Sequence, residues 1–354
     1  MDFEHHEERK LFSRFRYLAH LILLKGFILF VRITPYRAAA AAGRFFGLIV
    51  WACVPLHRRI AAVQIRFALG PENEKGISRR AFMNQGGLYV DMVKYAYMDD
   101  RSLSRKVTVE GGEHFEAALA SGRGIMIVTG HMNWEVLGHL PRLIGLEICV
   151  MADTIKNRAV QAVSEELRSR CRITVLPPRG GMVKRLTDEL LEGRIIGMVI
   201  DQRGKRENRL FCDVFGMPAP TNPAPAFIAL KGDALVLPVY AIRKDGRYTF
   251  RFERPLDARS FGDDFRTITK LCDSWKSEAV RSLSQTMHSW LCSVIRENPD
   301  QWFWLHCRWV RRSDMAKIVR TGMDFKKFVV AQAEDYLQIN NVLYEDHGKE
   351  VSSV

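Results

Sequence analysis

The chain has 354 residues, enough for one large domain or two modest ones. Hydrophobic residues make up 47% and charged residues 26%, a composition that excludes disordered and fibrous proteins. The formal net charge of +13 favours an anionic partner: nucleic acid, an acidic membrane surface, an acidic carrier protein or a phosphorylated substrate. The seven cysteines lie apart without a CxxC pair, which disfavours a zinc ribbon or a disulfide framework and indicates a reducing compartment.

The first 56 residues contain two apolar stretches. Residues 17–31 are interrupted mainly by Lys25, and residues 38–56 by Arg44. The first stretch is short for a membrane span, which needs about 20 residues. A cleaved signal peptide and a buried globular helix are the alternatives, but we favour a membrane-anchoring helix region over 1–56, spanning once or lying in the interface with its basic side chains snorkelling. The basic residues that flank these stretches are Arg32, Arg37, Arg58 and Arg59. Such residues prefer the cytoplasmic side of a membrane.

Between about residues 57 and 312, short apolar runs alternate with helical patterns. The runs predict strands at 124–129, 146–151, 173–176, 195–200, 234–242 and 248–252. The helical patterns cover 113–120, 134–144, 159–170, 182–191 and 223–231. This alternation predicts an α/β domain over 57–312, with a mixed, largely parallel sheet flanked by helices. Residues 313–354 are a polar tail of unassigned role, with one weakly amphipathic helix near 325–343.

His131 and Glu135 directly follow the buried run at 124–129, where open α/β sheets place ligands. At a spacing of four residues, or with His131 still in the turn, Glu135 can reach the imidazole and orient it. One ring nitrogen would then be free as a general base. Because no serine stands in a GxSxG elbow, the base is expected to activate a substrate hydroxyl directly. A partly buried histidine that caps the helix is the alternative.

His139 extends this pair into a stripe at i, i+4 and i+8, which could ligate a metal. The chain has neither an HExxH motif nor a clear further ligand, so a metal is disfavoured.

Three arginines crowd the end of the predicted helix at 159–170, namely Arg168, Arg170 and Arg172. Guanidinium groups bind phosphate or carboxylate bidentately, although a solvated basic face would look the same. Asp201 and Gln202 follow the strand at 195–200. The acid could orient an arginine or cap a loop.

Three tryptophans lie among basic residues at 298–312. Such a segment suits a membrane interface. Stacking of tryptophan on arginine inside the fold is an equal alternative.

Taken together and in order, these features resemble the late acyltransferases of lipid A biosynthesis, relatives of the glycerophospholipid acyltransferases. The resemblance covers about residues 15–312. It rests on an Arg-Arg helix at 57–65, a strand from Gly124 to His131, and Asn133-Trp134-Glu135 in the H-x4-D/E position. It continues with Arg168, Asp201-Gln202, Phe-Gly-x-Pro-Ala-x-Thr at 215–221, Leu237-Pro238-Val239, and Pro299 to Trp309. One departure is that three residues, where the family usually has four, separate His131 from Glu135.

The resemblance implies a membrane enzyme that moves a fatty acyl chain from a thioester, usually on acyl carrier protein, to a hydroxyl of a lipid A precursor at the cytoplasmic face of a bacterial inner membrane. It requires no metal or redox cofactor. Catalytic roles fall on His131, Glu135, Arg168 and Asp201, with Arg168 contacting substrate phosphate or the developing oxyanion near Asp201. Substrate-binding roles fall on Asn133, Trp134, Arg170, Arg172 and Gln202.

Other functions stay open beside this one. The acceptor could be another phospholipid or glycolipid, and the chain could be an inactive relative that binds lipid or carrier. A metal-dependent hydrolase is a weaker alternative. Nucleic acid is not expected as a partner, because the basic residues are dispersed along the chain and no recognised nucleic-acid-binding module occurs.

Overall fold

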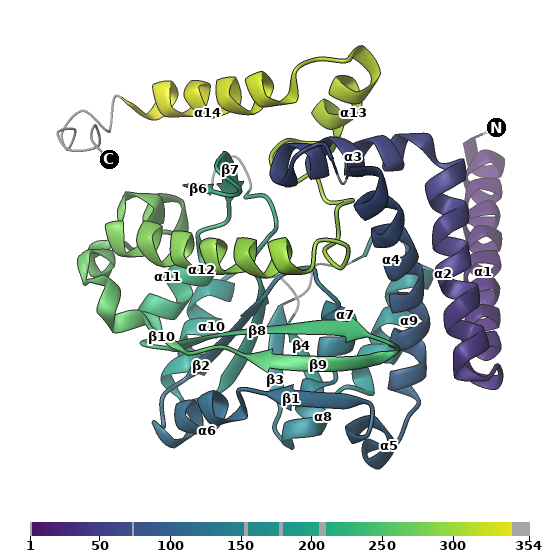
Figure 1. The fold of residues 1–354 in the computed structure, drawn as a ribbon, viewed down its shortest axis with the longest axis horizontal. Coiled ribbons are helices and arrows are strands. Elements are labelled where there is room, and N and C mark those ends of the chain that lie inside the picture. Colours follow the sequence, from purple (N-terminus) through teal and green to yellow (C-terminus); the bar gives the residue numbers. More distant parts are fainter. Residues whose placement is uncertain (1, 73, 152–154, 177–179, 205–209, 342–354) are drawn as a thin grey trace.

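The structure is a computed structural model that describes residues 2–72, 74–151, 155–176, 180–204 and 210–341. The chain begins with helices, namely α1 (Asp2–Ile33), α2 (Tyr36–Cys53), α3 (Pro55–Leu69), α4 (Glu74–Ala96) and α5 (Asp100–Ser104). Figure 1 shows α1, α2 and α4 side by side along one flank of the molecule. Helix α4 lies in the part of the chain for which the sequence predicts no element.

A mixed sheet forms the centre, in the order β1-β9-β8-β2-β5-β3-β4, with β10 paired to β8. Its strands are β1 (Val107–Glu110), β2 (Ile125–Thr129), β3 (Ile148–Met151), β4 (Ile173–Leu176), β5 (Ile195–Val199), β8 (Leu235–Lys244), β9 (Arg247–Phe252) and β10 (Leu256–Asp257). The pairs β8–β9 and β8–β10 are antiparallel, and the other pairs along this sheet are parallel. The predicted sheet and all six predicted strands are confirmed. A separate antiparallel ribbon joins β6 (Leu210–Asp213) to β7 (Pro218–Thr221).

Helices cover both faces of the sheet (Figure 1). One layer contains α10 (Met182–Leu191), α11 (Ala224–Lys231) and α12 (Glu278–Glu297), the last of which follows three short 3-10 turns, Ala258–Phe261, Asp264–Thr267 and Leu271–Lys276. The other contains α6 (Gly112–Ala120), α7 (Trp134–Leu137) and α8 (Leu140–Ile144). Strand β2 sends Met126 and Val128 to the first layer and Ile125 and Ile127 to the second. A strand buried on both faces reads as a continuous apolar run, which is why the sequence reveals it.

The helix predicted at 134–144 is broken into α7 and α8. Gly138 ends the first piece, and Pro141 lies in the first turn of the second, where its missing N–H costs nothing. Because of this break, His131, Glu135 and His139 do not lie on one continuous helix, and the helical stripe that they form in the sequence is absent from the structure.

The C-terminal tail packs on the body through α13 (Arg312–Thr321) and α14 (Phe325–Asn341). Helix α13 contacts α3, and α14 contacts α3 and β7. Phe325 meets the ring of Phe67 at 4.7 Å between centroids. The helix predicted at 325–343 is therefore present up to Asn341, and its last two predicted residues lie outside the described part.

Among the described residues, no single helix has both the length and the apolarity to cross a membrane, although α2 and α3, bent by 92°, pass that test as a pair. Helix α2 lies backbone to backbone on α4. A Cβ added at Gly47 would lie 2.1 Å from the carbonyl oxygen of Phe82, and one at Gly43 would lie 2.6 Å from that of Gly86. The expected membrane-anchoring helix thus stays a prediction.

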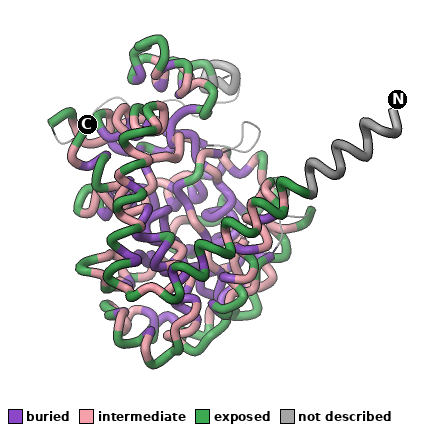
Figure 2. Tube along the Cα trace, turned by 90° about the vertical axis from the view of Figure 1, so that its right-hand side faces the viewer, coloured by how far each residue is buried: buried purple, intermediate pink, exposed green. Residues whose placement is uncertain are grey.

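The outer surfaces of α1 and α2 are rich in exposed apolar side chains. Figure 2 shows the coloured part of α1 running across the outside of the body, with exposed residues along much of that part. Ile22 and Leu23 are each 71% exposed. Among the side chains that the structure describes, the other large exposed apolar ones on these helices are Phe15, Leu18, Phe27, Leu29, Phe30, Ile33, Phe45, Phe46 and Ile49.

Candidate active site

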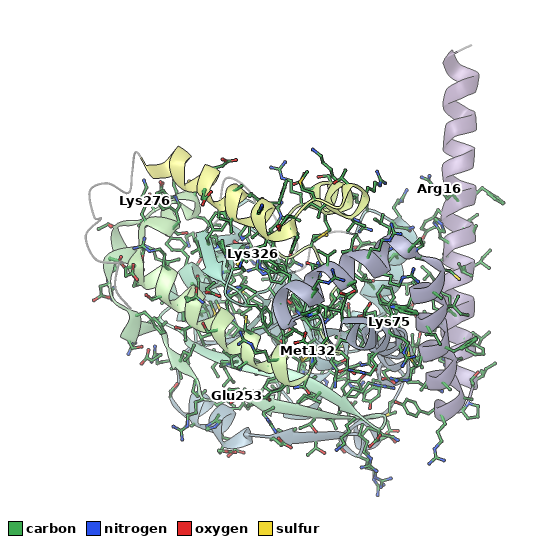
Figure 3. All side chains as sticks on the ribbon, turned by 45° about the horizontal axis from the view of Figure 1, so that its top comes forward. Arg16, Lys75, Met132, Glu253, Lys276 and Lys326 are labelled. Atoms are coloured by element: carbon green, nitrogen blue, oxygen red, sulfur yellow. The ribbon has the colours of Figure 1, made fainter. Side chains whose placement is uncertain are left out.

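The parallel register of β2 and β5 brings His131 and Asp201 together. Thr129 at the end of β2 pairs with Val199 at the end of β5, so the residues two places further on leave the sheet at the same edge. His131 Nδ1 lies 2.5 Å from Asp201 Oδ1, and the two side chains are 9% and 2% exposed. Figure 3 labels the next residue, Met132, within the body.

Asp201 is a fully engaged carboxylate. Its Oδ2 accepts the backbone N–H of His131 at 2.8 Å and the indole N–H of Trp302 at 2.6 Å. Burial alone would raise the pKa of Asp201, but the charge of His131 and these hydrogen bonds outweigh it and hold the pKa well below its usual range. An anionic Asp201 accepts a hydrogen bond from Nδ1–H of His131, which fixes the tautomer in which Nε2 is unprotonated.

This arrangement corrects two predictions. Glu135 is not the partner of His131, because Asp201 occupies Nδ1 and α7 begins only after the bend at Asn133. Glu135 instead faces Arg168, with 3.7 Å between Oε1 and Nη2. Asp201, expected near Arg168, neither orients an arginine nor caps a loop: it binds His131 and Trp302.

A loop at residues 298–311 completes the site from the far end of the chain. Trp302 forms a β-bridge with Met132, and the backbone N–H of Phe303 donates to the carbonyl of His131 at 3.0 Å. Gln64, buried on α3, donates to the carbonyl of Trp304 at 2.7 Å. Trp302, Trp304 and Trp309 are at most 3% exposed. These tryptophans therefore lie inside the fold, and the prediction that they lie at a membrane interface is wrong.

Aromatic rings surround the imidazole of His131. The ring centroids of His306 and Trp134 lie 4.3 Å and 4.7 Å away, and Phe303 packs on His306. Burial, followed by the charge of His131, lowers the pKa of His306 to about 4, so this second imidazole is neutral at neutral pH. The amide nitrogen of Gln202 is 3.5 Å from Nε2 of His131. Reacting groups must therefore approach Nε2 between these side chains.

The predicted substrate-binding residues divide into two sets. Trp134 and Gln202 lie at His131, as described above. Asn133 donates its amide hydrogens to Ala241 O at 2.9 Å and to Gln301 Oε1 at 2.8 Å, so it holds the loop in place and has no donor left for a substrate.

The three predicted arginines also divide. Arg168 lies beside Glu135, whereas the guanidinium of Arg170 stacks on Tyr97 at 4.0 Å and that of Arg172 lies 3.5 Å from Asp100. Helix α9 (Arg158–Ser169) ends before these two residues, which is why the turn directs them elsewhere.

His139 belongs to a different environment. Its Nδ1 lies 3.4 Å from Cys171 Sγ and 3.4 Å from Arg142 Nη1. Burial, followed by the charge of Arg142, lowers the pKa of His139 to about 3. The described residues contain no group of three metal-ligating side chains.

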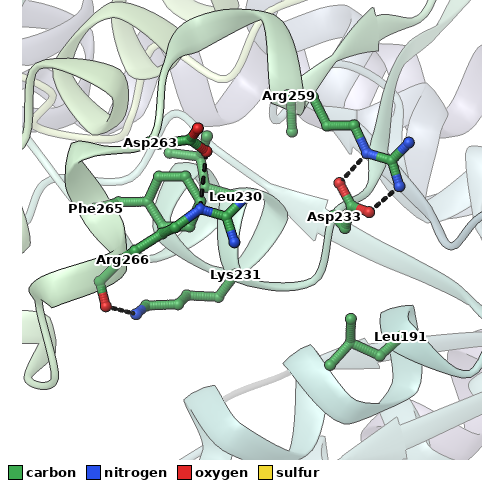
Figure 4. Close-up of a pocket in the computed structure, with 9 residues that line it drawn as sticks. Leu191, Leu230, Lys231, Asp233, Arg259, Asp263, Phe265 and Arg266 are labelled. Atoms are coloured by element: carbon green, nitrogen blue, oxygen red, sulfur yellow. Dashed lines mark hydrogen bonds and ion pairs between the residues drawn. The ribbon is translucent and has the colours of Figure 1, made fainter.

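A cavity of about 700 Å³ lies away from this site (Figure 4). Its lining includes Leu191 and Asp233, which precede the amino ends of β5 and β8, whereas His131 follows a carboxyl end. Two of its cations are paired, Arg259 with Asp233 and Arg266 with Asp263. The cavity is therefore separate from the His131 site.

The fold and the site define an α/β protein whose reactive side chains gather at the carboxyl ends of parallel strands, with a carboxylate-oriented histidine at the centre. The model of the family described as bacterial lipid A biosynthesis acyltransferase matches residues 7–311. The chain belongs to that family and is an acyltransferase, which confirms the resemblance drawn from its motifs. A search of curated proteins finds no match.

Proposed function

We propose that this enzyme transfers a fatty acyl chain from an acyl carrier protein thioester to a hydroxyl group of a lipid A precursor, with His131 as the general base. The observation that carries the proposal is the contact of 2.5 Å between His131 Nδ1 and Asp201 Oδ1. It leaves Nε2 as a proton acceptor, with Gln202, Trp134 and His306 as neighbours of the imidazole among the residues that the structure describes. A base in that position serves direct attack by a substrate hydroxyl.

The reaction proceeds in two proton-balanced steps. Nε2 of His131 removes the hydroxyl proton while the oxygen forms a bond to the thioester carbonyl carbon. Asp201 stabilises the resulting imidazolium through Nδ1–H. The tetrahedral intermediate then collapses, the carbon–sulfur bond breaks, and the imidazolium returns its proton to the departing thiolate. The products are an ester on the acceptor and a free carrier thiol.

Arg168 supplies positive charge beside this centre. Its guanidinium and the carboxylate of Glu135 are 25% and 21% exposed, so both can reach a bound substrate. Glu135 keeps the guanidinium in place, and Arg168 stabilises either a phosphate group of the acceptor or the oxyanion of the intermediate.

The exposed apolar surfaces of α1 and α2 support association with a membrane. Monomeric soluble proteins seldom expose contiguous apolar surface of this kind, and a helix with such a face lies in the lipid interface. The net charge of +13 favours both an anionic lipid surface and an acidic carrier protein. We therefore place the enzyme on the cytoplasmic face of a bacterial inner membrane, where acyl carrier protein is accessible.

A transfer assay tests the chemistry. Purified enzyme is incubated with acyl carrier protein thioester and a lipid A precursor, and the lipids are analysed by mass spectrometry. The wild type should add one acyl mass to the precursor, and His131→Ala should add none. A phospholipid acceptor and an acyl-coenzyme A donor are run in parallel, because efficient use of either would redirect the assignment. Normal transfer by His131→Ala would overturn the mechanism.

Vesicle flotation tests the membrane contact. The double variant Ile22→Ser/Leu23→Ser removes two exposed side chains of α1 and should lower partition onto anionic vesicles at least about 10-fold, since each such side chain contributes about 1.5–3 kcal/mol when fully buried. The matched control, Leu119→Ser/Leu191→Ser, alters side chains that are 38% and 61% exposed on other helices. Equal partition of the two double variants would refute the assigned surface.

A further inference from the structure

The helix that carries Arg168 is held by other helices as well as by the sheet. Helix α9 packs against α1, α4 and β4. Its Val163 and Leu167 are buried in an apolar cluster with side chains of α1, α2 and α4, separate from the two clusters that flank the sheet. Because the apolar side chains of α9 lie outside both sheet cores, the direction of Arg168 depends on the contacts that fix α9.

Arg168 lies on the opposite face of this helix from Glu166 and Arg170. An α-helix turns by about 100° per residue, so residues four apart share a face and the residue midway between them points to the other side. Arg170 follows the last residue of α9 and keeps helical backbone angles, with φ of −80° and ψ of −5°. Contacts on the face of Glu166 and Arg170 therefore determine where Arg168 points, which is toward Glu135.

Tyr97, which directly follows α4, contacts both residues of that face. Its hydroxyl donates to Oε1 of Glu166 at 2.8 Å. The guanidinium carbon of Arg170 lies 4.0 Å from the centre of its ring, within the range of a cation–π interaction. One side chain thus holds the helix at two points, one on each side of Arg168 in the chain. A double contact of this kind restrains rotation of the last turn of α9 about its axis.

Helix α1 supports the same contacts. Lys25 donates to Oε2 of Glu166, the oxygen that Tyr97 does not use. The guanidinium carbon of Arg32 lies 4.2 Å from the centre of the Tyr97 ring. Lys25 and Arg32 are seven residues apart and therefore share one face of α1. The helix to which we assign lipid contact thus also helps to fix α9.

The ion pair with Glu135 does not fix Arg168 by itself. Its separation of 3.7 Å exceeds the length of a charge-assisted hydrogen bond, about 2.7–2.9 Å. A guanidinium with so loose a partner takes its position from the backbone that carries it.

We propose that Tyr97, together with Glu166 and Arg170, positions Arg168 for acyl transfer by fixing the last turn of α9. The inference rests on the proposed function, in which Arg168 stabilises a phosphate group or the oxyanion. It makes Tyr97 a positioning residue, which acts through Arg168 and not on the reacting groups. It also gives Arg170 a structural partner in place of the substrate expected from the sequence.

A double-mutant cycle tests this role, because it separates a residue that acts through Arg168 from one that merely stabilises the fold. Tyr97→Leu should lower kcat/KM for the acceptor about 10- to 100-fold, since a misplacement of about 1 Å can cost about 10²-fold. In an Arg168→Ala background the same change should lower kcat/KM less than about 2-fold, because no guanidinium is left to position. Tyr97→Phe keeps the ring under Arg170 and should recover most of the loss.

A second, milder variant avoids a loss of folding. Glu166→Gln weakens the contact with Lys25 and should lower kcat/KM about 3- to 10-fold, the effect of one lost hydrogen bond. The matched control is Glu110→Gln, which weakens the ion pair with Arg251 on β1, at the opposite end of the strand order from β4, the strand that α9 contacts. This control should keep the wild-type kcat/KM. Melting temperatures are measured for every variant.

Equal losses from Tyr97→Leu with and without Arg168 would overturn the proposal, as would wild-type kcat/KM in both Tyr97→Leu and Glu166→Gln. The proposed function fails separately. If product forms only with the phospholipid acceptor or the coenzyme A donor, the proposed substrates are refuted, and the cycle is run with the substrates that react. A non-additive cycle there would uphold the role of Tyr97, and an additive one would overturn it.

Discussion

Asp201→Asn should disable the enzyme while leaving it folded. Two N–H groups, from the His131 backbone and Trp302, point at Oδ2 of Asp201, so the amide oxygen of asparagine will occupy that position. The amide NH2 then faces Nδ1 of His131, where Oδ1 lies at 2.5 Å. Nδ1 must become an acceptor, the proton moves to Nε2, and the histidine can no longer accept a proton from substrate. The same substitution behind the histidine of a Ser-His-Asp triad lowers kcat about 10⁴-fold.

The assay is acyl transfer to the lipid A precursor, measured with the melting temperature of each variant. Asp201→Asn keeps both hydrogen bonds to Oδ2 and reverses the third, with its amide NH2 donating to Nδ1, so its melting temperature should lie close to that of the wild type. Trp302→Phe is the graded control: it removes one donor, leaves the carboxylate facing Nδ1, and should lower kcat far less. A folded Asp201→Asn enzyme with kcat within about 10-fold of the wild type would refute the assigned tautomer.

Three further predictions follow from the same site and its surroundings. Arg168→Ala should lower kcat about 10²–10³-fold, and Arg168→Lys should restore it only in part. Adding Glu135→Ala to Arg168→Ala should lower kcat little further, because Glu135 acts through Arg168; additive losses of kcat in the double variant would contradict this. His306→Arg sets a permanent cation beside the imidazolium, because a guanidinium stays charged in a buried site, and should lower kcat at pH 7.5 at least about 10²-fold. His306→Phe keeps the ring packing and should cost less than about 10-fold; the reverse order would be inconsistent with a neutral His306. The pKa of His139 is about 3 in the folded protein, below that of an unfolded histidine, so the unfolded chain binds the proton more readily. The free energy of unfolding should therefore decrease as the pH falls below 6.5, by about 2 kcal/mol at pH 5. Urea titrations of His139→Gln should lack that part of the decrease.

The sequence revealed those elements whose signal is local. Strands buried on both faces appear as unbroken apolar runs, and α10 was predicted at its observed bounds, Met182–Leu191. The partner of His131 is not local. The spacing of four residues points to Glu135, whereas Asp201 is 70 residues away and becomes a neighbour only through the register of β2 and β5. Once those strands are known to be adjacent, their equal offsets from Thr129 and Val199 identify the pair.

The contribution of residues 298–311 was hidden for a related reason. The tryptophans and His306 were visible as a motif, but tryptophan beside arginine is equally typical of an interface and an interior. What decides the matter is Gln64, a buried amide on α3 that donates to Trp304 O and accepts the backbone N–H of Arg308 at 3.0 Å. No local pattern shows that this glutamine reaches across the fold.

The shortened segment between His131 and Glu135 affects Glu135 more than His131. The imidazole is positioned by Asp201, which follows another strand, and by rings from the 298–311 loop, so its orientation does not depend on how many residues lead to Glu135. The chain enters α7 through a single left-handed residue, Asn133, with φ of 51°, a conformation that asparagine tolerates better than most residues. Its amide secures the turn against Ala241 and Gln301. With the loop fixed in this way, Glu135 is directed toward Arg168, so the acidic residue of the motif faces the arginine while Asp201 binds His131.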